Sequence, residues 1–361
     1  MPRGAFLSVS RPAGRRALWC LIWLALIISL AETLARSDAV QSLLPAPSYG
    51  MVNRQFELQW DRLRTFVAQG GQPDCIFLGS SQMLRGVDPL AFAAAYREET
   101  GREPRCFNLG VRGLDPVNTY KAALLLLQEN NPRLLIIGTD IPSYSVQRAD
   151  RLRDKAFSEQ VWVRYRLGEP LVEGWLIDHS AALRAYLPKR FYFTIGHDAQ
   201  QVDAEEFDAV ITREGFGPTD FKSKVLGEPP GADDPQAELF EGLQDFQLAS
   251  DQLAALEATL ALRVRVPVII LELPLHSTFM HFFGNGRADY ERGLQAIRDR
   301  IAPAPVDFVE TTDQNIVPDS GWANRNHLNA QGAETFSRWL GAHLAGLTLD
   351  GKLPSLAGVT R

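Results

Sequence analysis

The chain has 361 residues, 45% of them hydrophobic, so it is long enough and apolar enough to bury a full core. Its 37 basic and 43 acidic residues give a net charge of -6, which provides no general field that would attract a phosphate backbone. The composition therefore indicates a globular protein and argues against nucleic acid as a partner.

A long apolar run lies near the N-terminus, between residues 17 and 31, and is broken only by Ser29. Basic residues precede it: Arg3, Arg11, Arg15 and Arg16. The run fits either a cleaved export signal, with Ser29-Leu30-Ala31 at the cut, or a membrane anchor that Leu34 and Ala35 extend. We favour the anchor and assign residues 1–36 to a cytoplasmic n-region and a membrane helix. The positive-inside rule then places the rest of the chain on the outer side of the membrane.

Residues 37–70 are predicted to form a juxtamembrane segment with one amphipathic helix. Its large apolar side chains recur at helical spacing: Phe56, Trp60, Leu63 and Phe66. We expect this helix to pack on the domain that follows.

From residue 71 onward, short apolar strands alternate with helical segments, which is the pattern of a parallel sheet. Five strands are predicted, in CIFLG, CFNLG, LLIIG, VPVIILELP and VDFVE. Helices are predicted after Pro89, from Asp115-Pro116, as one amphipathic stretch over 239–260, after Gly286 and after Asn329. The predicted fold is an α/β domain over residues 71–346 with a five-stranded, mainly parallel sheet.

Two segments depart from this alternation. Residues 143–235 are rich in aromatic and charged residues and lack the strand–helix alternation, so we interpret them as an insertion or cap. Its aromatic side chains could line a glycan or acyl groove, but a satellite core is the favoured interpretation for Trp162, Tyr165, Trp175, Tyr186, Phe191 and Tyr192. Residues 347–361 are predicted to be a loose tail.

Cys75 and Cys106 each lie four residues before a glycine that ends a predicted strand, so they would sit level on neighbouring strands. A disulfide could form there. Because level positions on adjacent parallel strands suit disulfide geometry poorly, we favour two small buried hydrophobic residues. Cys20 falls inside the anchor.

Ligands of open α/β sheets bind beyond the carboxyl ends of the strands. Ser80 and Ser81 follow the first strand, where a serine is either a turn or helix cap or a nucleophile. His327 lies in NRNHLNAQG, immediately before the last helix. Acyl transfer needs a serine held at a tight turn, an imidazole within hydrogen-bond reach and donors that face the oxyanion.

These segments resemble the SGNH (GDSL-like) hydrolases, because GSS, NLG and HLNxxG follow the blocks of that superfamily in order. Two segments resemble those of the envelope branch of this superfamily, typified by the D-alanyl transfer protein of teichoic acid synthesis. They are the anchor, which ends in AETLAR, and the segment LGSSQMLRGVDP. Related members assist polysaccharide O-acetylation. The resemblance implies a three-layer, flavodoxin-like sandwich. It also implies Ser81 as nucleophile, Ser81 and Gly110 as oxyanion donors, and His327 as general base.

Two positions depart from the pattern of that superfamily. Asp140 stands where the third block has an asparagine that donates to the oxyanion, and an ionised aspartate cannot donate. Asn324 stands where an aspartate usually orients the histidine. Asn324 could orient the ring through its amide oxygen, Asp319 could substitute if the loop folds back, or the serine and histidine could act as a dyad.

No cofactor or metal is predicted. His276 and His281 are five residues apart, a spacing with no recognised ligand geometry. Gly284-Asn285-Gly286 lacks the preceding strand and the third glycine of a dinucleotide-binding turn.

The resemblance leads us to expect a membrane-anchored extracytoplasmic serine esterase or O-acyltransferase that acts on acyl groups of cell-envelope glycans. It implies the bacterial inner membrane, with the domain in the periplasm or outside, and a membrane-bound O-acyltransferase as partner. The alternative is a non-catalytic glycan-binding or assembly subunit of an envelope acylation or polysaccharide export system.

Overall fold

The structure is a computed structural model that describes residues 11–41, 48–51, 53–148, 157–194, 210–220, 226, 230–231, 234, 236–301 and 308–356. Its centre is a five-stranded sheet with the order β2-β1-β3-β4-β5. The strands are β1 (Cys75–Gly79), β2 (Cys106–Gly110), β3 (Leu134–Thr139), β4 (Val268–Glu272) and β5 (Phe308–Val309). Every neighbouring pair is parallel. The expected α/β class and parallel sheet are therefore confirmed.

The strands form because their side chains are apolar on both faces, as is typical of a parallel sheet with both faces covered. Alternate residues of β1 enter different parts of the core: Ile76 and Leu78 join one cluster, and Cys75 and Phe77 join the other. The first cluster packs against α3 (Arg54–Gly70), α6 (Pro116–Glu129), α13 (Ser250–Ala261) and α14 (Arg287–Ile301). The second packs against α4 (Ser81–Gly86), α5 (Pro89–Thr100) and α15 (Ala330–Leu349).

Short elements complete the described chain. The remaining helices are α2 (Asp38–Gln41), α8 (Val161–Arg166), α9 (Val172–His179), α10 (Ala181–Thr194) and α12 (Ala237–Phe240). Single 3-10 turns are η1 (Ile141–Tyr144), η2 (Phe157–Glu159), η3 (Glu241–Asp245), η4 (Leu262–Val264), η5 (Ser277–Phe282) and η7 (Asp319–Gly321). A two-stranded antiparallel sheet, β6 (Trp322–Asn324) and β7 (His327–Leu328), was not predicted.

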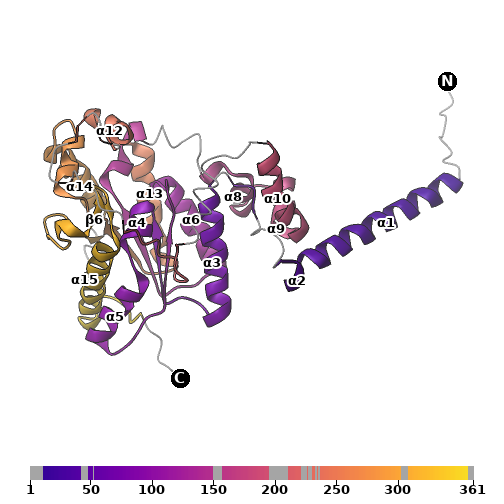
Figure 1. The fold of residues 1–361 in the computed structure, drawn as a ribbon, viewed down its shortest axis with the longest axis horizontal. Coiled ribbons are helices and arrows are strands. Elements are labelled where there is room, and N and C mark those ends of the chain that lie inside the picture. The colour runs from indigo at the N-terminus through magenta and orange to yellow at the C-terminus, as the bar shows by residue number, and fades with distance from the viewer. Residues whose placement is uncertain are drawn as a thin grey trace.

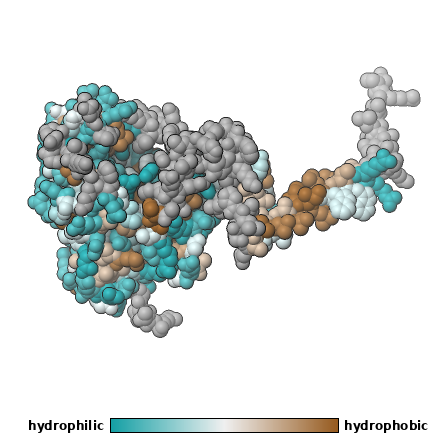
Figure 2. Space-filling model, viewed as in Figure 1, coloured by the Kyte–Doolittle hydropathy of each residue, from teal (hydrophilic) through white to brown (hydrophobic). Residues whose placement is uncertain are grey.

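The N-terminal helix α1 (Arg11–Ala35) extends away from the rest of the molecule (Figure 1). Its segment Gly14–Ala35 is 22 residues long and includes an 18-residue stretch with a mean hydropathy of 2.1, so it is long and apolar enough to cross a membrane. Figure 2 shows hydrophobic residues over the middle of this helix and hydrophilic ones at its outer end. Residues 1–10 of the expected n-region lie outside the described residues.

The predicted amphipathic helix is confirmed as α3, and Phe56, Trp60, Leu63 and Phe66 are all buried. Part of the 143–235 segment packs against it, since the Trp162 ring lies 6.2 Å from the Trp60 ring. Trp162 is thus buried, but in the main core and not in a satellite core, whereas Trp175 and Tyr186 are exposed. The side chains of Phe191 and Tyr192 lie outside the described part of the chain.

The favoured interpretation of the cysteines was wrong, because Cys75 and Cys106 form a disulfide. They are register partners on β1 and β2, as expected, and their Cα atoms are 4.6 Å apart. This separation lies inside the range that disulfides span, so level positions on parallel strands do not prevent the bond. Both residues are buried as well.

The single helix predicted over 239–260 is interrupted. Residues around Leu248 are extended because they pair with the segment after η1: Ser145 and Leu248 form an antiparallel bridge, and the Val146 N–H donates to the Gln247 carbonyl at 2.9 Å. Tertiary pairing thus divides the apolar repeat into α12, η3 and α13.

The predicted loose tail is also wrong for the residues described. Helix α15 continues to Leu349, and the chain then folds back so that Leu353 and Leu356 are buried in the core. The Leu356 N–H donates to the Tyr96 hydroxyl at 3.2 Å. Residues 347–356 are therefore part of the domain, and 357–361 lie outside the described residues.

Candidate active site

The turn between β1 and α4 gives its two serines different environments. Ser80 is the N-cap of α4, and its hydroxyl accepts from the Gln82 N–H at 3.3 Å. Ser81 is the first residue of α4 and is half-buried. The N–H groups of a first helical turn have no acceptor inside the helix, so the Ser81 N–H points out of the helix end. The cap interpretation thus applies to Ser80, and the Ser81 hydroxyl is not used in this cap.

His327 is carried by the β6–β7 hairpin. Asn324 and His327 are paired across this hairpin, and two residues later Asn329 caps α15 by accepting from the Gly332 N–H at 3.0 Å. The hairpin and the helix cap together fix the histidine backbone near the carboxyl end of β1. Ser81 and His327 are 246 residues apart in the sequence, and the fold brings them together.

The Ser81 Oγ and the His327 Nε2 are 2.9 Å apart, which is a hydrogen-bond distance. On the other side of the ring, Nδ1 lies 3.1 Å from the Asn324 Oδ1. The same oxygen accepts from the backbone N–H groups of His327 and Asn326, at 2.9 Å and 3.1 Å. Three donors thus fix the orientation of the Asn324 amide. The Nδ1 must carry the proton, and the Nε2 lone pair faces the serine hydroxyl.

Asp319, the expected substitute for the third member, contacts a different histidine. Its Oδ1 lies 3.4 Å from the His276 Nε2, and its side chain is almost fully exposed. Both residues line a cavity of about 140 Å³ next to Trp322. Burial lowers the pKa of His276, although the nearby Asp319 charge opposes this shift. Of the three alternatives for His327, the geometry matches orientation by Asn324.

The Gly110 N–H, expected to donate to an oxyanion, already has an acceptor within the protein. That N–H donates to the Asn108 Oδ1 at 2.8 Å. The close packing of α4 explains why this position is glycine, because a Cβ here would lie 2.3 Å from the Leu84 nitrogen. Gly110 thus supports the helix that begins with Ser81.

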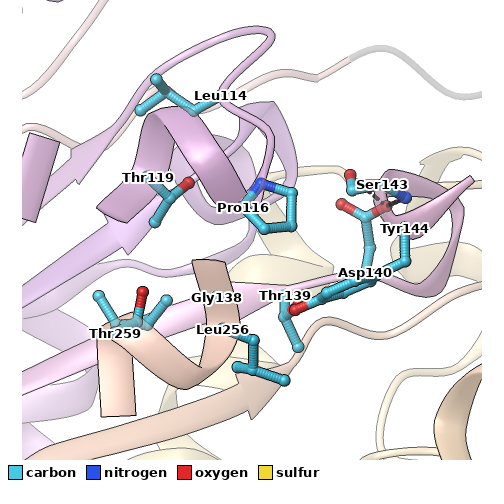
Figure 3. Close-up of a pocket in the computed structure, with 11 residues that line it drawn as sticks. Leu114, Pro116, Thr119, Gly138, Thr139, Asp140, Ser143, Tyr144, Leu256 and Thr259 are labelled. Atoms are coloured by element: carbon cyan, nitrogen blue, oxygen red, sulfur yellow. Dashed lines mark hydrogen bonds between the residues drawn. The ribbon is translucent and has the colours of Figure 1, made fainter. Parts of the chain in front are cut away.

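Asp140 caps the turn η1 at the end of β3. Its Oδ1 accepts from the Ser143 N–H at 3.0 Å and from the Ser143 hydroxyl at 2.8 Å, as Figure 3 shows. The residue is buried and lines a small cavity of about 20 Å³ together with Tyr144 and Leu256. Asp140 therefore accepts hydrogen bonds from Ser143 and supplies no donor for an oxyanion.

Three arginines act on the histidine through their charges, and we did not predict them. The pKa of His327 is lowered to about 3, first by burial and then by the charges of Arg85, Arg148 and Arg112. These residues follow β1, β3 and β2, which are neighbours in the sheet. Burial and the Arg112 charge lower the pKa of Arg85 to about 10. Arginine after a strand end, as in SQMLRG and NLGVR, was the available sequence signal.

A second unpredicted group anchors the histidine loop. Arg325 forms a buried ion pair with Asp234. Gln236 accepts from the Arg325 N–H at 3.2 Å and donates to the Asn326 side chain. The end of the 143–235 segment thus holds the turn between Asn324 and His327. No local pattern in the sequence signals these contacts, because they join residues about 90 positions apart.

The described residues contain no group of three or more His, Cys, Asp or Glu side chains that could hold a metal ion.

No protein-family model matches the chain, and no curated protein matches it either.

Proposed function

We propose that this protein is a membrane-anchored, extracytoplasmic serine esterase or O-acyltransferase of the SGNH type that acts on acyl groups of cell-envelope glycans. The observation that carries the proposal is the chain of contacts from the Ser81 Oγ to the His327 Nε2, 2.9 Å, and from the His327 Nδ1 to the Asn324 Oδ1, 3.1 Å. The parallel sheet is compatible with a three-layer, flavodoxin-like sandwich that bears an inserted cap.

In the proposed reaction, His327 removes the hydroxyl proton of Ser81 while the Oγ attacks an acyl carbonyl. The imidazolium then gives its proton to the leaving oxygen, and the acyl-enzyme passes its acyl group to water or to a sugar hydroxyl. Asn324 keeps the ring in the required tautomer but supplies no negative charge. Since the pKa of His327 is about 3, the histidine is a weak base, and we expect a slow reaction.

Negative charge on the carbonyl oxygen needs stabilisation, and two features support it. The Ser81 N–H lies at the start of α4, where helix N–H groups point outward. The positive charges of Arg85, Arg112 and Arg148 favour an anion near the pair. The Gly110 N–H can contribute only if it leaves the Asn108 oxygen.

Two features support the proposed location. Helix α1 has the length and composition of a single membrane span. The Cys75–Cys106 disulfide is typical of oxidising compartments such as the periplasm or the cell exterior. A site tethered beside the bilayer suits an acyl donor delivered through the membrane, so a membrane-bound O-acyltransferase is the proposed partner.

A second candidate function is a non-catalytic glycan-binding or assembly subunit of an envelope acylation or polysaccharide export system. The observation that favours it concerns the oxyanion side: the Gly110 N–H is used by Asn108, and Asp140 stands where a donor is expected.

Labelling with a serine-directed fluorophosphonate separates the two candidates. We expect the wild type to be labelled and Ser81→Ala and His327→Ala to lose the label. Ser80→Ala is the matched control, because it removes a neighbouring hydroxyl that caps α4 at a cost of about 1 kcal/mol but leaves the nucleophile. A folded wild type that resists labelling would favour the non-catalytic subunit.

A further inference from the structure

The end of α1 is joined to the start of α10 by a carboxylate. The first N–H groups of a helix have no partner inside it. In α10, the Ala181 and Ala182 N–H groups donate to the Glu32 carboxylate at 2.9 Å and 3.3 Å, and the Ser180 hydroxyl donates to it as well. The Leu183 N–H donates to the Ser180 Oγ at 3.0 Å. Glu32 thus serves as a cap supplied by another helix.

A second contact holds the same junction. The Arg36 guanidinium donates to the His179 carbonyl at 2.9 Å, at the last residue of α9. Arg36 also lies 3.5 Å from Glu32. Glu32 lies in the last turn of α1 and Arg36 directly follows this helix, so α9 and α10 are held at its carboxyl end. Figure 1 shows α9 and α10 next to this end of α1.

The helix pair exposes apolar side chains beside the junction. On α9 they recur at positions i, i+3 and i+4, which lie on one face of a helix. We name this surface the α9–α10 face; its residues and exposed fractions are Val172 (74%), Trp175 (49%), Leu176 (42%) and Tyr186 (59%). The Trp175 ring stacks on His179 with ring centres 4.9 Å apart. The opposite side of α9, with Gly174 and Ile177, is buried.

We infer that the α9–α10 face rests in the outer interface of the lipid bilayer that α1 crosses. This inference rests on the anchor proposed above. Lipid is the occupant because the face is continuous with the membrane helix, to whose end Glu32 and Arg36 fix it. Tryptophan and tyrosine are the aromatic residues enriched at membrane interfaces. Glu173 is the acidic residue exposed beside the face, and its carboxylate can extend to water.

Contact with the bilayer at two places has a consequence for the domain. A single helix with a loose connection lets a domain turn freely above the membrane. With α1 inserted and the α9–α10 face in the interface, the domain has one side toward the lipid. The opposite side of the molecule, which carries α14 and α15, then faces away from the membrane (Figure 1).

Nitroxide spin labels on the full chain in phospholipid vesicles test this inference. Oxygen concentrates in hydrocarbon, whereas a nickel chelate stays in water, so the ratio of collision rates reports the depth of a label. The test positions are Val172→Cys and Leu176→Cys in a Cys20→Ser background. Matched controls are Leu90→Cys and Leu239→Cys, whose side chains are 56% and 57% exposed on α5 and α12. A label on the native Cys20 reports α1 itself.

We expect labels at 20, 172 and 176 to collide preferentially with oxygen, and labels at 90 and 239 with the nickel chelate. If Cys20 prefers oxygen but 172 and 176 match the controls, the inference is overturned while the anchor stands. If Cys20 itself is open to the chelate, the proposed anchor fails together with the inference. Labels at 172 and 176 that are shielded from both reagents would mean that protein covers the face, which also overturns it.

Discussion

Asn324→Asp keeps the side-chain oxygen that faces the His327 ring. It replaces the amide nitrogen with a second carboxylate oxygen. The backbone N–H groups of Asn326 and His327 can still donate to the side chain, so we expect the hairpin to fold as before. The substitution therefore adds a negative charge about 3.1 Å from Nδ1 with little other change.

The size of the effect follows from that distance. An opposite charge within about 4–6 Å typically shifts a pKa by about 1–3 units, and each unit corresponds to about 1.4 kcal/mol. The pKa of His327 should rise from about 3 by this amount, and the imidazolium that forms in the transition state should be stabilised. Since Asn324 already keeps the ring proton on Nδ1 in the wild type, the substitution adds only the negative charge. The full shift would correspond to about 10-fold to 1,000-fold; because the proton is only partly transferred in the transition state, we expect kcat/KM at neutral pH to increase by about 10-fold to 100-fold.

Hydrolysis of p-nitrophenyl acetate across a pH series measures both parts of this prediction. The rate should rise, and the acid limb of kcat/KM should move to higher pH. Asn326→Asp is the matched control, since it puts the same charge in the same turn on a side chain that accepts from Gln236. A folded Asn324→Asp protein with an unchanged rate and an unchanged acid limb would refute the assignment of His327 as base.

Further predictions concern the titration of His327, the packing of Gly110 and the disulfide. Because the pKa of His327 is about 3, activity should persist well below pH 6.5, and Arg148→Gln should move the acid limb upward. In the same range the unfolded chain takes up a proton that the folded chain does not, so the free energy of unfolding should fall by about 1.4 kcal/mol for each unit of falling pH. Gly110→Ala should cost about 1–3 kcal/mol and slow fluorophosphonate labelling, because its Cβ would meet the backbone of α4. Replacing both Cys75 and Cys106 with alanine should lower the free energy of unfolding by about 3–4 kcal/mol, since the bond closes a loop with a sequence separation of 31.

Controls are available for each of these measurements. His327→Gln should make the acid dependence of stability less steep, and the part that remains comes from groups such as His276, whose pKa is also lowered. Gly86→Ala, at the other end of α4, should be tolerated, because its Cβ would meet only a Leu328 methyl at 3.9 Å. Wild-type protein unfolded under reducing conditions should match the double alanine variant. Equal stability of the oxidised wild type and that variant would contradict the assigned bond.

The sequence was informative wherever a local pattern determines the structure. Asp115-Pro116 began α6 as predicted, and the five apolar runs became the five strands, because capping and burial act over a few residues. The strand ends correctly placed Ser81 and His327 at one edge of the sheet. That part of the site follows from topology alone.

The remaining features depend on contacts between distant residues. The break before α13 arises because Leu248 pairs with Ser145, and the histidine turn is held by Asp234 and Arg325. The Gly110 N–H donates to Asn108, whose side chain is in turn oriented by the carbonyls of Met83 and Val87, more than 20 residues away. The spacing of Cys75 and Cys106 predicts that they lie side by side on neighbouring strands, but it does not predict whether they form a disulfide.

The central claim is that Ser81 is acylated during turnover. Rapid mixing with p-nitrophenyl acetate, acid quenching and peptide mass spectrometry test it directly. We predict one acetyl group on the peptide that contains Ser81, mapped to that residue, and none in His327→Ala. Acetyl groups that appear only on lysines, or equally in Ser81→Ala, would contradict the account.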